Sequence, residues 1–192
     1  MKKICVFCSS SNNLNEIYHQ DANKLGALLA QNNYELVYGG SFRGLMGEVA
    51  LGAKNSGAKV TGIMPKKIFD FIEGEQGPCD NFVLTDNLRD RKQKLDEASD
   101  AFIALAGGFG TLDEIIEVLD LKILGYHNKP IIFLNTNHFY DSLVEFFENF
   151  VKQKFASDKV FTAFYVAQKP EDVITYLENY KHEEINLIAF KS

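Results

Sequence analysis

The chain has 192 residues, of which 46% are hydrophobic and 24% are charged, and these are the proportions of a globular protein that builds a core without disulfides or metal. The formal net charge is −6, so the chain lacks a general basic surface, and we expect neither nucleic acid nor a membrane as a partner. No apolar run approaches the roughly 18 residues of a membrane helix, and the apolar run Ile4–Cys8 is shorter than the core of a signal peptide. With an odd number of cysteines, three, these features predict a cytoplasmic protein.

Short apolar runs alternate with segments of helical periodicity along the whole chain. The expected strands are residues 4–8, 35–38, 59–63, 82–84, 101–105, 131–134 and 161–166. The expected helices are residues 18–29, 45–55, 86–98, 112–124, 140–153 and 171–180. Nearly continuous apolar strands separated by helices predict an α/β fold, a parallel sheet with helices on both faces, as a single domain over residues 1–192. The connection 65–81 is expected to be irregular, and the C-terminal tail 181–192 is left unassigned.

Three strand-to-helix junctions are rich in small residues: residues 8–11, 38–47 and 106–114. Ligands of open parallel sheets bind at the carboxyl ends of the strands, where helix N-termini offer free N–H groups. In the third junction, Gly107, Gly108 and Gly110 let backbone amides approach an anion, and Thr111 adds a hydroxyl donor. The pattern is neither G-x-G-x-x-G nor a P-loop, so neither a dinucleotide nor a triphosphate is the expected ligand. The alternative is that these glycines only turn the chain and cap a helix.

Two cations interrupt the apolar face of the helix expected at 86–98. Leu88 and Leu95 mark its core-facing stripe, and Arg91 and Lys92 lie between them on that face. A buried cation is costly unless it is paired, so these side chains should meet an anion or reach the edge of the sheet. Binding of a ligand phosphate and a structural ion pair of Arg91 both remain open.

Glu114 lies in the first turn of the helix that follows the third junction. A carboxylate there can simply complement the helix dipole. Alternatively, it faces the sugar of a bound nucleotide, where it can stabilise an oxocarbenium-like transition state or activate water.

The same helix is apolar on more than one face. Leu112, Ile115, Ile116, Leu119 and Ile123 form the expected sheet-facing stripe, whereas Val118 and Leu121 lie well away from it. A helix that is apolar almost all round is buried almost all round. We therefore expect a homodimer that forms through this helix.

Other residues with the chemistry of a site are given structural roles. Cys5 and Cys8 have redox spacing, but they lie along a strand, where residues three apart point to opposite faces, so core packing is expected. His127 is expected to shape a helix-to-strand turn. No group of residues has the spacing of a zinc site.

The third junction and the Arg91-Lys92 pair together resemble the motifs of a known family. Residues 106–114, Ala-Gly-Gly-Phe-Gly-Thr-Leu-Asp-Glu, with Arg91-Lys92 upstream, resemble the PGGxGTxxE and RK motifs of the LOG (Lonely Guy) family. These proteins are cytokinin riboside 5′-monophosphate phosphoribohydrolases that were once called lysine decarboxylases. Shorter matches follow in family order at residues 5–10, 37–40, 44–47, 63–65, 100–104 and 127–130. The chain departs from the family pattern at Ala106, where the motif has proline, at Asp90 and Arg89, where glutamate and histidine are usual, and in having no tryptophan.

The resemblance implies a Rossmann-like, doubly wound fold and a homodimer. It further implies hydrolysis of the N-glycosidic bond of an adenine nucleoside 5′-monophosphate, cytokinin-type or plain, with no cofactor and no metal. Arg91 and Glu114 would be the catalytic pair. The residues that the resemblance implies for substrate binding are Ser10, Gly39, Gly40, Met46, Glu73, Lys92, Gly107, Gly108, Gly110 and Thr111.

Two other functions stay open. The glycines and Thr111 of the third junction would form a phosphate cradle. A non-catalytic nucleotide-binding module could use this cradle for sensing or carriage. A decarboxylase with pyridoxal phosphate would need a Schiff-base lysine, and no local context marks any lysine as such.

Overall fold

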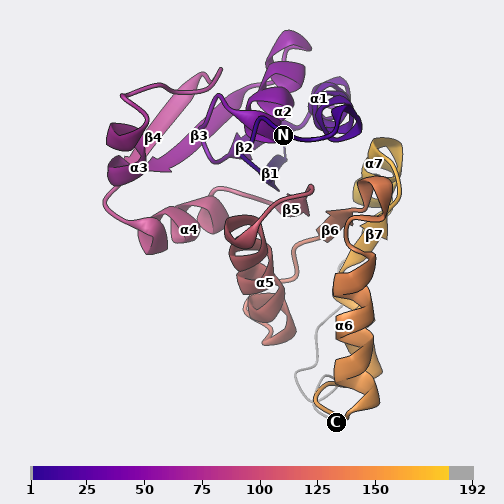
Figure 1. The fold of residues 1–192 in the computed structure, drawn as a ribbon. Helices are drawn as coiled ribbons and strands as arrows, with labels where there is room; N and C mark the ends of the chain where they lie inside the picture. Colours follow the sequence, from indigo (N-terminus) through magenta and orange to yellow (C-terminus); the bar gives the residue numbers. More distant parts are fainter. Residues whose placement is uncertain (1, 182–192) are drawn as a thin grey trace.

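Seven strands form one parallel sheet in the order β4-β3-β2-β1-β5-β6-β7 (Figure 1). The structure is a computed structural model that describes residues 2–181. The strands are β1 (Lys3–Phe7), β2 (Glu35–Tyr38), β3 (Val60–Pro65), β4 (Asn81–Thr85), β5 (Ala101–Ala104), β6 (Ile131–Leu134) and β7 (Tyr165–Ala167). The chain runs outward from β1 to β4 and then returns to β5 on the other side of β1. The strand order therefore reverses between β1 and β5, which is where doubly wound sheets bind ligands.

Helices cover both faces of the sheet, as expected. Along β1, Ile4 and Val6 enter one core, whereas Cys5 and Phe7 enter the other. The first core is completed by α1 (Glu16–Gln31), α2 (Gly44–Asn55) and α7 (Pro170–Asn179). The second core is completed by α4 (Leu88–Glu97), α5 (Phe109–Ile123) and α6 (Asp141–Lys152). The α/β class, the parallel sheet and the Rossmann-like, doubly wound arrangement are therefore confirmed.

Two expected elements differ from the structure. The connection 65–81 is not irregular throughout, because α3 (Lys66–Phe71) follows β3 directly. The strand expected at 161–166 is instead a 3-10 helix, η2 (Asp158–Thr162), followed by β7; a second one, η1 (Thr136–His138), follows β6. Phe161 and Phe164 are three residues apart, and both rings pack into the second core. That spacing suits a helical turn, whereas alternate residues of a strand would point to opposite faces.

The buried stripe of α5 is also turned relative to the expected one. Leu112 is 37% exposed, whereas Val118 is only 5% exposed. The buried set includes Thr111 and Glu114, because Glu114 pairs with Arg91 of α4. On α4, Leu88 was expected to face the core and is 56% exposed. A count of apolar residues alone cannot locate a stripe that contains a buried ion pair.

The structural roles expected for Cys5, Cys8 and His127 are confirmed. The two cysteines are buried in opposite cores, and burial raises the pKa of both thiols. His127 links α5 to the turn before β6, because its Nε2 lies 3.0 Å from the Val118 carbonyl and its Nδ1 accepts from the Lys129 amide. Among the described residues, no helix is long and apolar enough to cross a membrane. The tail 181–192 lies outside the described residues except for residue 181.

Candidate active site

The three small-residue junctions meet around one pocket of about 630 Å³ at the carboxyl ends of the central strands. Backbone hydrogen bonds hold the junctions together. The Ser9 amide donates to the Ala106 carbonyl at 3.2 Å, and the Leu45 amide donates to the Ser9 carbonyl at 3.0 Å. The loops after β1, β2 and β5 therefore form one frame at the point where the strand order reverses.

The N-terminus of α5 opens into this pocket. Gly108 is its N-cap and supplies no side-chain hydrogen bond, and the amide of Leu112 makes the first helical bond, to the Gly108 carbonyl. The N–H groups of residues 109–111 therefore precede the hydrogen-bonded part of the helix and can bind an anion. A Cβ atom added to Gly108 or Gly110 would meet nothing within 4 Å, whereas one on Gly107 would lie 2.1 Å from Thr111 Oγ1. Gly107 thus permits the tight turn, and Gly108 and Gly110 keep the mouth of the cradle open.

Arg91 and Glu114 form a buried ion pair at the wall of the same pocket. Arg91 Nη1 donates to Glu114 Oε1, and Arg91 Nε donates to the Ile63 carbonyl at 3.0 Å. The two residues are only 7% and 6% exposed. A Cβ atom on Gly39 would lie 2.6 Å from Arg91 Nη2, so the glycine makes room for the guanidinium. The tip of β2 therefore helps to position the pair.

The second carboxylate oxygen of Glu114 is available for chemistry. Within the described residues, Glu114 Oε2 accepts no hydrogen bond. Burial raises the pKa of the Glu114 carboxyl, and the charge of Arg91 offsets only part of that effect. A carboxylate with one oxygen anchored and the other open can stabilise developing positive charge or take a proton from water. The ion pair and the ligand-facing position of Glu114 are thus compatible.

Most of the site residues predicted from the sequence line this pocket. They are Ser10, Gly39, Met46, Arg91, Gly108, Gly110, Thr111 and Glu114. Gly107 packs against Thr111, and Gly40, with a φ of 80°, packs near Phe82. Glu73 lies in an exposed turn with a φ of 57°. The roles of these residues stay predictions.

Lys92 is not among the residues that line this pocket, and its side chain pairs with carboxylates of α5. Its Nζ lies 3.0 Å from Asp113 Oδ2 and also pairs with Glu117. The lysine therefore clamps α4 to α5, the two helices that carry Arg91 and Glu114.

Arg43 also lines the pocket, and sequence reasoning missed it. Its Nη2 lies 3.9 Å from Glu75 Oε2. Arg43 belongs to the second small-residue junction, residues 38–47. A cation in a loop that is expected to bind an anion is the sequence signal that points to this residue.

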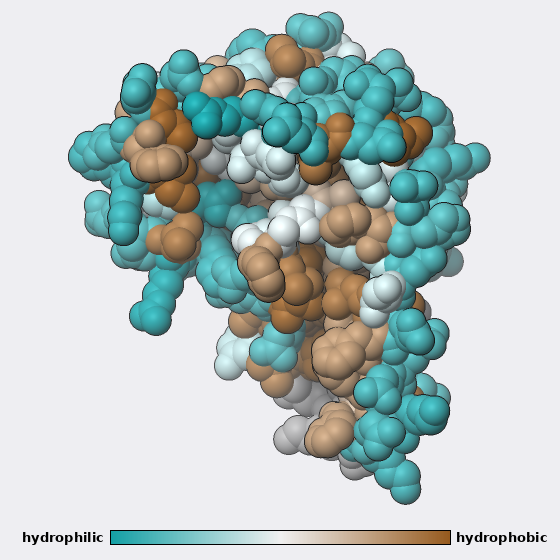
Figure 2. All heavy atoms as spheres, in the orientation of Figure 1, coloured by the Kyte–Doolittle hydropathy of each residue, from teal (hydrophilic) through white to brown (hydrophobic). Residues whose placement is uncertain are grey.

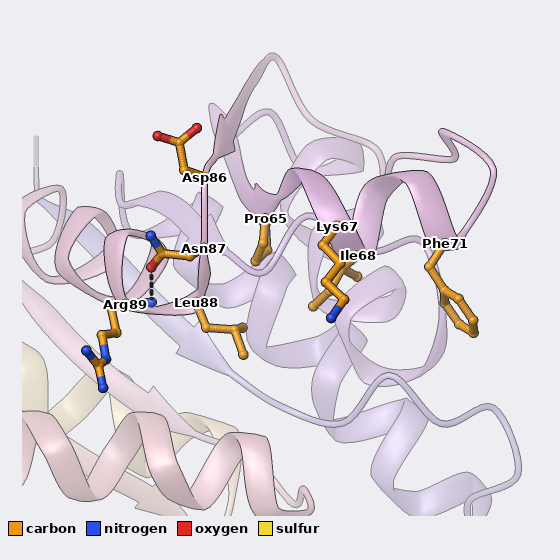
Figure 3. Close-up of a pocket in the computed structure, with 8 residues that line it drawn as sticks. All are labelled: Pro65, Lys67, Ile68, Phe71, Asp86, Asn87, Leu88 and Arg89. Carbon is orange, nitrogen blue, oxygen red and sulfur yellow. Dashed lines mark hydrogen bonds between the residues drawn. The ribbon is translucent and has the colours of Figure 1, made fainter.

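An apolar annex of about 790 Å³ adjoins the pocket between α3 and α4 (Figure 3). The two cavities share Pro65, Ile68, Phe71 and Leu88 as wall residues. Phe71 is 82% exposed, and Figure 3 shows it projecting from the end of α3. A ligand bound in the pocket could therefore place an apolar group against α3.

Comparisons with known proteins assign the chain to a family. The sequence profile described as "Possible lysine decarboxylase" matches residues 46–177. The chain is 37% identical to cytokinin riboside 5′-monophosphate phosphoribohydrolase LOG2 of Arabidopsis thaliana, over 95% of this chain and 86% of that protein. It is also 37% identical to the probable phosphoribohydrolase LOGL2 of rice (Oryza sativa subsp. japonica), over 96% of this chain and 76% of that protein.

Solved structures show the same fold. The molybdenum cofactor binding protein of Rippkaea orientalis has a TM-score of 0.71 at 24% identity, covering 93% of this chain and 96% of that one. The molybdenum cofactor carrier protein of Chlamydomonas reinhardtii has a TM-score of 0.71 at 23% identity, covering 92% and 96%. These solved structures share the fold, and the sequence matches show that the chain is a member of the LOG family.

Proposed function

We propose that the protein hydrolyses the N-glycosidic bond of adenine nucleoside 5′-monophosphates and releases the free base and ribose 5-phosphate. One observation carries the proposal: the open carboxylate oxygen of Glu114 and the uncapped amides of α5 face the same pocket. The amides suit the 5′-phosphate, and the carboxylate suits the anomeric carbon. The names of the 37% identical relatives support the same reaction.

The mechanism follows from these positions. The amides of residues 109–111 hold the phosphate and so fix the ribose. As the bond between C1′ and the base nitrogen breaks, its electron pair leaves with the base, and Glu114 stabilises the positive charge on the sugar. Water then adds to C1′ and gives up a proton through Glu114, and the base gains a proton, so the products balance. Arg91 keeps Glu114 oriented by holding Oε1.

The annex favours a base that carries an apolar substituent. Its shared wall residues, Ile68, Phe71 and Leu88, are apolar and adjoin the nucleotide pocket. Burial of each CH₂ group there contributes about 0.8 kcal/mol. A prenylated, cytokinin-type adenine nucleotide is therefore the better substrate in this proposal, and plain AMP is the weaker one.

The experiment is an assay of base release. Purified protein is incubated with AMP and with its N6-isopentenyl analogue, and free base and pentose phosphate are quantified by chromatography. For each nucleotide, the proposal expects free base and pentose phosphate to be released in equal amounts. It expects much less base from the corresponding nucleosides, which lack the phosphate. Nucleotide binding without base release would instead support a non-catalytic binding module.

A homodimer through α5 belongs to the same proposal. Phe109 is 93% exposed and Leu112 is 37% exposed on the first turn of this helix, and Tyr126, beyond its end, is 77% exposed. Figure 2 shows apolar side chains gathered over α5 and toward α6 on this face. A second copy would cover them. Sedimentation of wild-type protein and of Phe109→Ser tests this: the proposal expects a dimer that the substitution weakens, and a wild-type monomer would contradict it.

A further inference from the structure

The pocket contains one cation that the catalytic pair does not use. Its charged wall residues are Arg43, Arg91 and Glu114. Arg91 donates to Glu114 and to the Ile63 carbonyl, so its guanidinium is already engaged in holding the catalytic carboxylate. Arg43 is the remaining positive charge available to a ligand in the described part of this pocket.

The side chain of Arg43 is held only weakly. Its partner, Glu75, lies 3.9 Å away, and the two side chains are 46% and 57% exposed. An exposed pair of this kind contributes little to stability. The guanidinium also lies 5.2 Å from the centre of the Phe42 ring. The side chain can therefore turn toward a new partner at small cost.

The backbone of Arg43, by contrast, is fixed. Its amide donates to Ser41 Oγ at 3.1 Å, and the next amide, of Gly44, donates to Asn12 Oδ1 at 2.8 Å. Arg43 is the N-cap of α2, but its side chain makes no cap hydrogen bond. Replacing the side chain therefore removes a charge from the pocket without removing a helix cap.

We propose that Arg43 is a binding residue for the 5′-phosphate, which displaces Glu75 from the guanidinium when substrate enters. The inference rests on the proposed function, because it assigns a partner to the anion of that substrate. The uncapped end of α5 offers the equivalent of only about half a positive charge, whereas a phosphate monoester carries about −1.5 to −2. A guanidinium matches phosphate geometry with two parallel hydrogen bonds and supplies the missing charge.

The first test compares Arg43→Gln with the wild type on ribose 5-phosphate, by calorimetry, and on AMP and adenosine, by base release. We expect the dissociation constant of ribose 5-phosphate and the KM for AMP to rise roughly 10- to 100-fold, the effect of losing a charged hydrogen bond. The activity on adenosine should not change. Arg43→Lys should recover part of the loss, because it restores the charge without the planar fork. Lys24→Gln is the matched control, since it breaks another exposed ion pair, with Glu171, and should leave all values unchanged.

The second test uses Glu75→Gln, which should act in the opposite direction. Removing the competing carboxylate frees Arg43, so the KM for AMP should fall, by up to about fivefold for an exposed pair. In the Arg43→Gln background the same substitution should have no effect, which a double-mutant cycle reads directly.

Several results would overturn the inference. Equal loss of activity on AMP and adenosine in Arg43→Gln would show that the residue does not act through phosphate, as would an unchanged dissociation constant for ribose 5-phosphate. A rise in KM with Glu75→Gln would contradict the exchange of partners. A wild-type protein that binds ribose 5-phosphate through Arg43 but releases no base would refute the proposed function and leave this inference standing.

Discussion

Replacing Glu114 by glutamine changes one charge and almost no shape. The amide oxygen of glutamine can still accept from Arg91 Nη1, so the wall of the pocket should stay in place. What disappears is the negative charge that faces the anomeric carbon in the proposed reaction. Loss of one such stabilising group commonly lowers kcat by about 10² to 10³, or about 2.7 to 4 kcal/mol of barrier.

The effect of Glu114→Gln on stability should be much smaller than its effect on rate. Breaking a fully buried ion pair costs about 3 to 5 kcal/mol, but this pair lines an open pocket, and its hydrogen bond survives the change. Burial also raises the pKa of Glu114, which shows that the charged form is disfavoured there, and glutamine relieves that penalty. We expect a net loss of about 1 to 2 kcal/mol, which lowers Tm by about 2 to 8 °C in a chain of this size.

Three measurements on the Glu114→Gln protein separate chemistry from folding. Base release gives kcat, calorimetry with ribose 5-phosphate reports whether the phosphate cradle is intact, and a thermal melt gives Tm. The expected outcome is a kcat reduced at least about 100-fold with product affinity within a factor of about two, because the group that is lost does not touch the phosphate. A kcat close to that of the wild type would refute the assignment of Glu114.

Further predictions concern the cradle, the pH profile and the annex. Gly110→Val should raise the KM for nucleotide at least about tenfold with little change in Tm, because its side chain would enter open space where phosphate binds. The reaction requires the ionised form of Glu114, and burial raises the pKa of this carboxyl. The kcat/KM of the wild type should therefore fall on acidification, through a pKa above the ordinary glutamate value of about 4.3. The pH–rate profile of Glu114→Gln should lack this fall. Phe71→Ala should lower kcat/KM for the N6-isopentenyl nucleotide by about fivefold relative to AMP, the effect of losing about 1 kcal/mol of apolar contact; an unchanged ratio of the two substrates would place the substituent elsewhere.

The layers of the fold could be read from local patterns. Strands such as 101–104 are continuous apolar runs, and the glycines after them mark the junctions, so the parallel sheet and the cluster of loops were predictable. The turn at 158–164 was not, because a short apolar run with Phe161 and Phe164 suits either a strand or a helical turn until its neighbours are known.

The site could be predicted in its parts but not in its connections. Arg91 and Glu114 stood out because a cation interrupted an apolar stripe and an acid followed a glycine loop. The buried face of α5 includes Glu114 because this residue pairs with Arg91 of α4. This pairing depends on α4 lying beside α5, which no local pattern encodes. The sequence likewise gives no sign that Lys92 pairs with Asp113 and Glu117, as the structure shows, and its role at the ligand stays a prediction.

The most direct test of the account is a crystal structure of the Glu114→Gln protein with AMP bound, since the substitution should slow turnover enough to trap the substrate. The phosphate should lie on the amides of residues 109–111, with C1′ of the ribose facing residue 114 and the base directed toward the annex. A nucleotide bound elsewhere, or one whose ribose faces away from residue 114, would contradict the proposal that this pocket cleaves the glycosidic bond.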